Sequence, residues 1–541
     1  MLKVWELFAV SAAYVGVLFA IAYVGDQRAA GGAPARGGRW IYSLALGVYC
    51  TSWTFYGAVG RAATSGWDFL PIYLGPILVF VFGAPLIGRI VAISKRHNIT
   101  SIADFIGARY GRHQPLSMLV TLIAVIGVLP YIALQLKAVA FSFDVLAAPT
   151  PTQAGQGVDN ALVIAALLAM FSILFGTRQV VSSENHHGMV LAIAFESVIK
   201  LLAFLAIGLY AVYGLYQGPA DAYAHALALP QVTRNLDNPV WLSGFATQTL
   251  LAAAAIVCLP RQFHVTVVEN TAPADLATAR WVFPLYLALI SLFVLPIAAA
   301  GLEHLPAGVR ADTYVLALPM SGQHGTLALV AYLGGFSAAT SMVIVATIAL
   351  STMLCNEVVM PLLLRWRALG LARRSDLSGL LKAIRRAAIV ALVLLAYLYY
   401  RNFTGPGTLA SIGLLSFAAV LQFTPALVGG LYWRRGAYPG AVAGICIGFA
   451  LWLYTLLLPI LLPSGWLEHG PLGIAALRPQ ALFGLTGLDP VTHSTLWSLA
   501  GNLLAYVGVS LLAKPGLHER LQAARFLGLD PAGTAAPGAA P

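Results

Sequence analysis

Long apolar runs alternate with short polar segments along the whole 541-residue chain. A transmembrane helix needs about 20 mostly apolar residues, and runs of that kind predict about thirteen spans. Their centres fall near residues 14, 50, 80, 130, 168, 203, 252, 291, 340, 393, 420, 451 and 503. The first run, from about Val4 to Val24, is longer than the apolar core of about 7–15 residues in a signal peptide, so we expect a retained helix.

The loops between these runs carry charge unevenly. One set of alternate loops holds about 22 lysines and arginines and the opposite set about 6. Because cytoplasmic loops are the basic ones, the pattern predicts an N-terminus outside, a C-terminus in the cytoplasm and a bacterial-type inner membrane. The basic segment from about Leu364 to Arg386 is expected to lie on anionic lipid of the inner leaflet, with partner binding as the alternative.

Composition agrees with a membrane protein and narrows the function. Only 9% of residues are charged, 59% are hydrophobic and the mean hydropathy is +0.82, whereas soluble domains carry about 25% charged residues. The net charge of +11 lies in short loops, which argues against nucleic-acid binding. The four cysteines all lie in apolar segments, so neither a disulfide framework nor a metal-ligand spacing is present.

Two parts of the chain differ in character. Residues 1–514 are predicted to form the membrane domain, and residues 515–541 a cytoplasmic tail. The tail contains a short helical stretch, about His518–Leu527, followed by the low-complexity run Ala532–Pro541. That run lacks the apolar residues for a core and is expected to be disordered.

Two spans contain small and hydroxylated residues where a lipid-facing helix would be apolar. The second reads Gly-Val-Tyr-Cys-Thr-Ser-Trp-Thr-Phe-Tyr-Gly from Gly47 to Gly57. In the ninth, Ser337, Thr340 and Ser341 share one helix face. Broken helices with free carbonyls and hydroxyls can bind a cation at the membrane midplane. Close helix packing through small residues is the alternative.

These segments and two others resemble the sodium/solute symporter family. The other two are Tyr131-Ile-Ala-Leu-Gln135 after Pro130, and the late block from Phe423-Thr-Pro425 through Leu431-Tyr-Trp-Arg-Arg435 to Gly440-Ala-Val-Ala-Gly444. The resemblance implies a LeuT-type 5+5 inverted-repeat fold with its core at about residues 40–435. It also implies a break after Pro260, in the first helix of the second repeat.

The resemblance further implies two sites. The cation site would use carbonyls of the broken second helix and hydroxyls of the ninth, with Na⁺ or H⁺ as the coupling ion: Gly47, Cys50, Ser337, Thr340 and Ser341. The substrate site would lie beside it, with Trp53 as the stacking residue, and would comprise Trp53, Thr51, Ser52, Tyr131 and Gln135. Tyr49 stands where the proline symporters carry an aspartate, so sodium coupling, proton coupling and no coupling all stay open.

A closer resemblance is to the transporter-like N-terminal module of the CbrA-type sensor histidine kinases. It is carried by Tyr49–Gly60, Pro130–Val139 and Cys258–His264. This implies a small-molecule solute, with an amino acid such as histidine as the leading class. It also implies a possible histidine-kinase partner or kinase domains missing from this chain.

Charged residues inside spans are costly in lipid and are functional candidates. Glu196 and Lys200 stand four apart and are expected to form a structural salt bridge, with a proton-linked role as the alternative. Arg261 and His264 follow the Pro260 break as an inner gate or as an anchor at the cytoplasmic edge.

The sequence favours a cation-coupled secondary transporter, with a solute-sensing module as the second hypothesis. The chain ends without a kinase domain, which shifts the expectation towards transport. An intramembrane enzyme is not expected, because the chain lacks His-Glu-x-x-His, Gly-x-Ser-x-Gly and paired intramembrane aspartates.

Overall fold

The computed structural model describes residues 4–31, 37–147, 160–176, 187–235, 239–366, 376–403, 409–461 and 469–528. Within these ranges the chain forms helices and short connections, without strands. This confirms the predicted all-α class. The low-complexity run Ala532–Pro541 and part of the basic segment predicted to lie on lipid fall outside the described residues.

The helices follow the predicted order. Those of the first half are α1 (Val4–Ala30), α2 (Gly38–Ala45), α3 (Ala58–Ser65), α4 (Pro71–Val81), α5 (Ala84–His97), α6 (Ile102–Arg109), α7 (Gln114–Leu146), α8 (Asn160–Gly176), α9 (His187–Tyr210), α10 (Pro219–Ala228) and α11 (Pro230–Thr233). Those of the second half are α12 (Pro239–Cys258), α13 (Pro260–Phe263), α14 (Pro273–Leu292), α15 (Val294–His304), α16 (Tyr314–Ser321), α17 (Gly325–Met353), α18 (Met360–Arg365), α19 (Ser378–Phe403), α20 (Leu409–Leu421), α21 (Thr424–Tyr432), α22 (Tyr438–Trp452), α23 (Leu458–Leu461), α25 (Pro490–Leu512) and α26 (Leu517–Leu527). The 3₁₀ and π turns between them are η1 (Leu46–Tyr49), η2 (Trp53–Gly57), η3 (Gly66–Phe69), η4 (Ala211–Leu215), η5 (His264–Val268), η6 (Ala311–Thr313), η7 (Leu354–Val359), η10 (Leu453–Leu457), η11 (Pro471–Gly473), η12 (Ala475–Leu477) and η13 (Leu482–Gly484).

Each predicted span centre falls in a helix or at a break in one. In the described ranges, nine helices are long and apolar enough to cross a membrane, and a pair bent by 59° makes ten. That pair, Trp53–Phe69 with Pro71–Val81, begins just after the centre of the second predicted span and contains the centre of the third. The fifth and tenth spans coincide with α8, whose apolar part is Leu162–Leu174, and with α19, which carries basic residues near both ends.

Two of the long helices are interrupted in mid-course. Cys50 is extended, with φ −75° and ψ 104°, and separates η1 from η2. Leu259 is extended, with φ −65° and ψ 129°, and separates α12 from α13. The residue before a proline avoids the helical region, which explains the second break, at the position predicted from Pro260. At the first break, Thr51 gives the backbone an alternative hydrogen bond, because its Oγ1 accepts from Trp53 N.

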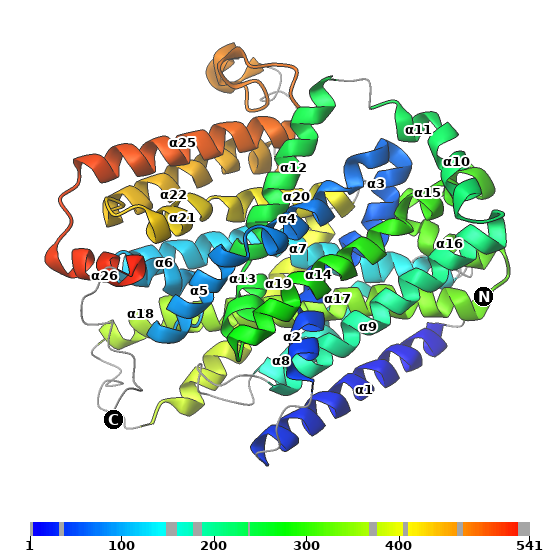
Figure 1. Cartoon of the computed structure of the whole chain (residues 1–541), viewed down its shortest axis with the longest axis horizontal. Coiled ribbons are helices and arrows are strands. Elements are labelled where there is room, and N and C mark those ends of the chain that lie inside the picture. The colour runs from blue at the N-terminus through cyan, green and yellow to red at the C-terminus, as the bar shows by residue number, and fades with distance from the viewer. Residues whose placement is uncertain are drawn as a thin grey trace, which may run out of the picture.

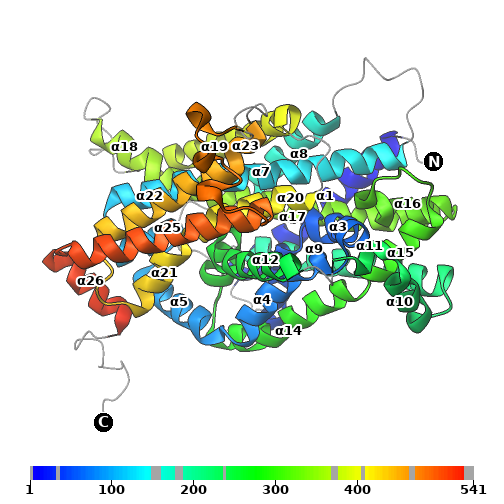
Figure 2. The same ribbon diagram turned by 90° about the horizontal axis from the view of Figure 1, so that it is seen from above.

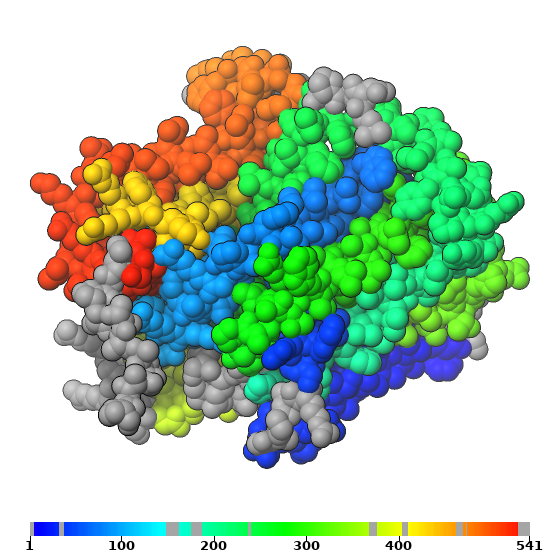
Figure 3. Space-filling view, in the orientation of Figure 1, coloured from blue at the N-terminus to red at the C-terminus, as the bar shows by residue number. Residues whose placement is uncertain are grey.

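Around these breaks the helices pack in one bundle (Figures 1 and 2). α17 lies inside it and packs against α7, α8, α9 and α19, while α1 lies outside against α9, and α22 pairs with α25. Both views place α18 and α26 at one end of the bundle and α10, α11 and α16 at the other. On the face shown in Figure 3, a diagonal blue band crosses the molecule, and α4 within it lies between α12 and α14.

The predicted short helix of the tail is α26, and it is docked on the bundle. Phe526 is buried against Phe105 and stacks on His97, with ring centroids 5.3 Å apart in the second pair. The Glu519 carboxylate accepts a 2.6 Å hydrogen bond from the backbone N–H of Tyr438, at the start of α22.

Candidate functional site

The predicted cation site surrounds a lysine side chain. Lys200, on α9, lies fully inside the bundle and its Nζ donates three hydrogen bonds. Two go to backbone carbonyls at the first helix break, Gly47 O at 3.3 Å and Cys50 O at 3.0 Å. The third goes to Ser341 Oγ on α17, at 3.0 Å. Three of the five predicted cation-site residues therefore meet at one ammonium group.

The other two predicted cation-site residues bind Glu196 instead. Thr340 Oγ1 donates to Glu196 Oε1 at 2.6 Å, and Ser337 Oγ donates to the main-chain carbonyl of Glu196 at 2.9 Å. All of these groups are buried. The hydroxyl face of α17 thus holds both charged residues of α9, and the predicted structural salt bridge between Glu196 and Lys200 is replaced by separate bonds to neighbouring helices.

The close approach of α9 to the first break depends on Gly47. A Cβ atom at this position would lie 2.7 Å from Ser197 Oγ and 2.9 Å from Ser197 Cβ, well inside van der Waals contact. Because glycine has no Cβ, η1 can lie against α9 within reach of Lys200. Tyr49, the residue that departs from the family pattern, points elsewhere, and its hydroxyl donates to Ile72 O at 2.7 Å.

Four of the predicted substrate residues lie together just after the break at Cys50. They are Thr51, Ser52, Tyr131 and Gln135. Gln135 Oε1 accepts from Ser52 N at 3.1 Å, so that α7 caps the first turn after the break. Thr51 Oγ1 and Tyr131 OH are 3.1 Å apart, and Thr51 Oγ1 also accepts from Trp53 N at 3.3 Å. The Ser52 hydroxyl is buried and has no hydrogen-bond partner in the described part of the chain.

The fifth predicted substrate residue, Trp53, packs against Phe417 and Tyr131, with ring centroids 5.1 and 6.3 Å away, and its indole lies against Gly413. It also forms part of the wall of a small pocket with a cavity volume of about 10 Å³. The other lining residues are Arg61, Asp68, Phe69, Ile72, Gln248, Ala252, Ala410, Leu414 and Phe417. The pocket thus reaches the predicted substrate region at Trp53.

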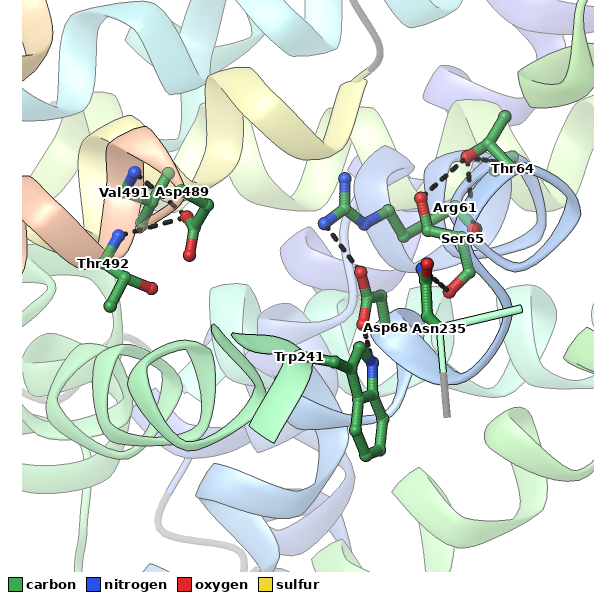
Figure 4. Close-up of polar contacts among 10 residues, drawn as sticks. Arg61, Thr64, Ser65, Asp68, Asn235, Trp241, Asp489, Val491 and Thr492 are labelled. Atoms are coloured by element: carbon green, nitrogen blue, oxygen red, sulfur yellow. Dashed lines mark hydrogen bonds and ion pairs between the residues drawn. The ribbon is translucent and has the colours of Figure 1, made fainter. Parts of the chain in front are cut away.

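The polar part of the pocket wall is held by hydrogen bonds (Figure 4). Arg61, on α3, binds the Asp68 carboxylate at 3.1 Å, and the indole N–H of Trp241, on α12, donates to the other carboxylate oxygen at 2.5 Å. Asn235 fixes the turn between α3 and η3 through the carbonyl of Ser65, at 3.3 Å. These hydrogen bonds connect the pocket wall to α3, in the first helix of the first repeat, and to α12, in the first helix of the second repeat.

Arg261 was expected to be an inner gate or an anchor at the cytoplasmic edge, and the structure places it inside the bundle. It is 1% exposed, and its guanidinium lies over the Tyr131 ring, 4.4 Å from the centroid. Among the described residues, none of its three nitrogens has a hydrogen-bond partner. Arg261 is therefore neither exposed at a cytoplasmic edge nor paired with a carboxylate. His264, three residues later, has its Nε2 atom 3.1 Å from Oε1 of Glu269.

Lys200 and Arg261 were singled out in the sequence by one signal, which is charge within an apolar run. Ionisable residues in spans mark functional sites more often than structural ones. Their partners were not predictable, because Gly47 and Cys50 lie about 150 residues before Lys200, and Tyr131 lies 130 residues before Arg261.

Comparisons with known proteins bear on the fold and on the class of the protein. No known family profile matches the chain. Two proteins of Bacillus subtilis (strain 168) are similar to it. The uncharacterized symporter YhjB is 24% identical over 418 residues, which is 75% of this chain and 79% of that protein. The uncharacterized symporter YodF is 21% identical over 444 residues, which is 81% of this chain and 83% of that protein.

Among solved structures, a Na⁺-coupled sialic acid symporter in a substrate-bound outward-open state superposes with a TM-score of 0.66. Its identity is 14%, and the match covers 94% of this chain and 98% of that one. These similarities confirm the LeuT-type fold and lend no support to the sensor-kinase module. The chain is a multi-pass membrane protein with the LeuT-type fold, a secondary transporter by class and not an enzyme.

Proposed function

We propose that the chain transports a small solute bearing a carboxylate, with an amino acid such as histidine as the leading candidate, by alternating access. The observation that carries the proposal is the unpaired guanidinium of Arg261 beside Tyr131. An arginine stays charged in proteins, and a buried charge without a partner is expensive. A solute carboxylate would supply the missing partner in a two-pronged hydrogen bond.

The predicted substrate residues have matching roles in this proposal. Trp53 and Tyr131 offer aromatic faces to the solute, and the free hydroxyl of Ser52 offers a polar contact. Thr51 and Gln135 hold the break in shape through their bonds to Tyr131 and Ser52. The solute would enter by the pocket at Trp53 and reach Arg261 when the aromatic contact between Trp53 and Tyr131 opens.

The protein would then open on the membrane side opposite to the entry pocket and release the solute there. In folds of this type one helix bundle rocks against the rest around a fixed midplane site. The two breaks, at Cys50 and Leu259, provide places where half-helices can change direction. Each half can then follow the motion without disturbing the hydrogen bonds of the other half.

Uptake of radiolabelled amino acids into proteoliposomes tests the proposal. Sodium and proton gradients are imposed in turn, because the sequence left both open and the structural neighbour is Na⁺-coupled. We expect accumulation of at least one amino acid, histidine being tested first, above empty liposomes. Failure of all common amino acids with either gradient would contradict the substrate class.

The role of Arg261 is tested separately by binding to purified protein. A hydrogen bond to a charged group contributes about 1.5–3 kcal/mol, so Arg261→Gln should weaken binding about 10- to 150-fold. Arg261→Lys keeps the positive charge but lacks the two-pronged guanidinium. Its affinity for the solute should therefore fall between those of the wild type and Arg261→Gln. The exposed Arg234 provides a matched control, since Arg234→Gln should leave binding unchanged.

A change in the ligand tests the same contact. The wild type should discriminate against an amino-acid amide, whose carboxylate is neutralised, and Arg261→Gln should not discriminate. Equal binding of acid and amide by the wild type would overturn the assignment of Arg261.

We also propose the orientation predicted from loop charge, with α26 in the cytoplasm of a bacterial-type inner membrane. The supporting observation is that α26 and α10 lie at opposite ends of the bundle (Figure 1). A single cysteine introduced at the exposed Leu517 should then react with a membrane-impermeant thiol reagent in inside-out vesicles and not in whole cells.

A further inference from the structure

We infer that the Lys200 ammonium takes the place of the sodium ion at the cation site of this fold, so that Na⁺ does not bind there. The inference concerns the site whose transport role is proposed above. It is carried by a different observation, the three bonds of Lys200, and it stands even if the solute is not an amino acid.

The ammonium group uses all of its hydrogen-bonding capacity at this site. A lysine Nζ has three N–H donors and no acceptor. Lys200 directs them to Gly47 O, Cys50 O and Ser341 Oγ at 3.0–3.3 Å. These are two carbonyls and a hydroxyl, the hard oxygen donors that an alkali cation would require, and they come from the break and from α17, the two elements predicted to hold the ion.

A sodium ion does not fit beside this group. The three oxygens already converge on Nζ, and an added cation would share them with a positive charge. Two unit charges about 4 Å apart at a dielectric of about 20 repel strongly enough to lower affinity by about a thousandfold. Glu196 adds no ligand among these three oxygens, because its Oε1 accepts a hydrogen bond from the Thr340 hydroxyl.

This arrangement changes how the break, α9 and α17 are held together. A dissolved ion would join these elements only when its concentration was sufficient. Lys200 is covalently part of α9, so the same oxygens are joined at every sodium concentration. If sodium drives uptake in this protein, it acts at a different position.

The test measures the thermal stability of purified wild-type protein in detergent, without solute, in NaCl and in KCl at equal ionic strength. We expect one melting temperature in both salts. Lys200→Ala removes the ammonium and leaves its three oxygens, so this variant should gain a saturable stabilisation by Na⁺. The double variant Lys200→Ala with Ser341→Ala should lose most of that gain.

A second buried lysine provides the control. Lys137, on α7, is 7% exposed and makes none of the bonds described for Lys200. Lys137→Ala should therefore create no response to Na⁺. A response there would indicate that loss of any buried lysine admits the ion, which would overturn the assignment.

Two further results would overturn the inference. One is saturable stabilisation of the wild type by Na⁺ that Ser341→Ala abolishes. The other is a folded Lys200→Ala protein that does not respond to Na⁺.

Should Lys200→Ala fail to fold, Ser341→Ala in the wild-type background still decides. It should lower the melting temperature equally in both salts, and a loss seen only in NaCl would contradict the inference. Because no readout uses solute or flux, failure here is distinct from failure of the proposed transport function.

Discussion

At the scale of single residues, the site combines buried charges that are fully bonded with one that is not. Lys200 and Glu196 have hydrogen-bond partners of the right type within 3.3 Å, whereas Arg261 has only the face of Tyr131. A cation over an aromatic ring is stabilised by about 2 kcal/mol when desolvated, which is less than a bonded carboxylate provides. This difference is why we assign Lys200 to structure and Arg261 to the solute.

The cap provided by Gln135 leads to a prediction at this scale. Gln135→Leu should leave the buried Ser52 N–H without an acceptor and lower the free energy of unfolding by about 1–3 kcal/mol. Thermal melts or denaturant titration in detergent would measure it. Gln27→Leu, at an exposed position on α1, should have little effect, and an equal loss in both variants would show that the cap has no special role.

Residue-level prediction from sequence succeeded for local features and failed for distant ones. Gly47, Cys50 and Ser341 were identified from small and hydroxylated residues in apolar spans, and the structure brings them together. The sequence paired Lys200 with Glu196 because they stand one helical turn apart. In the folded bundle, Lys200 instead donates to acceptors at the first break and on α17. These acceptors compete with Glu196 for Lys200, and the local spacing of residues does not reveal them.

At the scale of elements, the breaks at Cys50 and Leu259 organise the site. Each has a local cause, a cluster of hydroxyl residues in one and Pro260 in the other, so both positions were predictable. The path of each half-helix after its break was not, because it is set by contacts such as those of η1 with α9 and of η2 with α20.

The approach of η1 to α9 through Gly47 is testable. Gly47→Ala places a Cβ 2.7 Å from Ser197 Oγ, and overpacking of this kind costs about 1–3 kcal/mol. The variant should melt at a lower temperature, and adding Ser197→Gly should restore part of the loss, which a double-mutant cycle quantifies. Gly325→Ala is the matched control, since nothing lies within 4 Å of a Cβ at that position. Additive effects of Gly47→Ala and Ser197→Gly would contradict this contact.

At the scale of the whole molecule, hydropathy located the long helices, but not short ones such as α10, α11 and α16, and composition identified the membrane environment. The pocket at Trp53 was not predictable, because its wall combines residues 53–72 with α12 and α20, and these three parts are far apart in the chain. The same holds for α26, whose sequence predicts a short helix but not its docking through Phe526.

The central claim is that this chain carries a solute across the membrane and does not merely bind it. Counterflow tests this directly, because proteoliposomes loaded with unlabelled amino acid exchange it for labelled amino acid without any ion gradient. We predict transient accumulation of label in wild-type vesicles and a much smaller accumulation with Arg261→Gln. Tight binding of the amino acid by the wild type without any exchange would contradict the account and would indicate a sensing module instead.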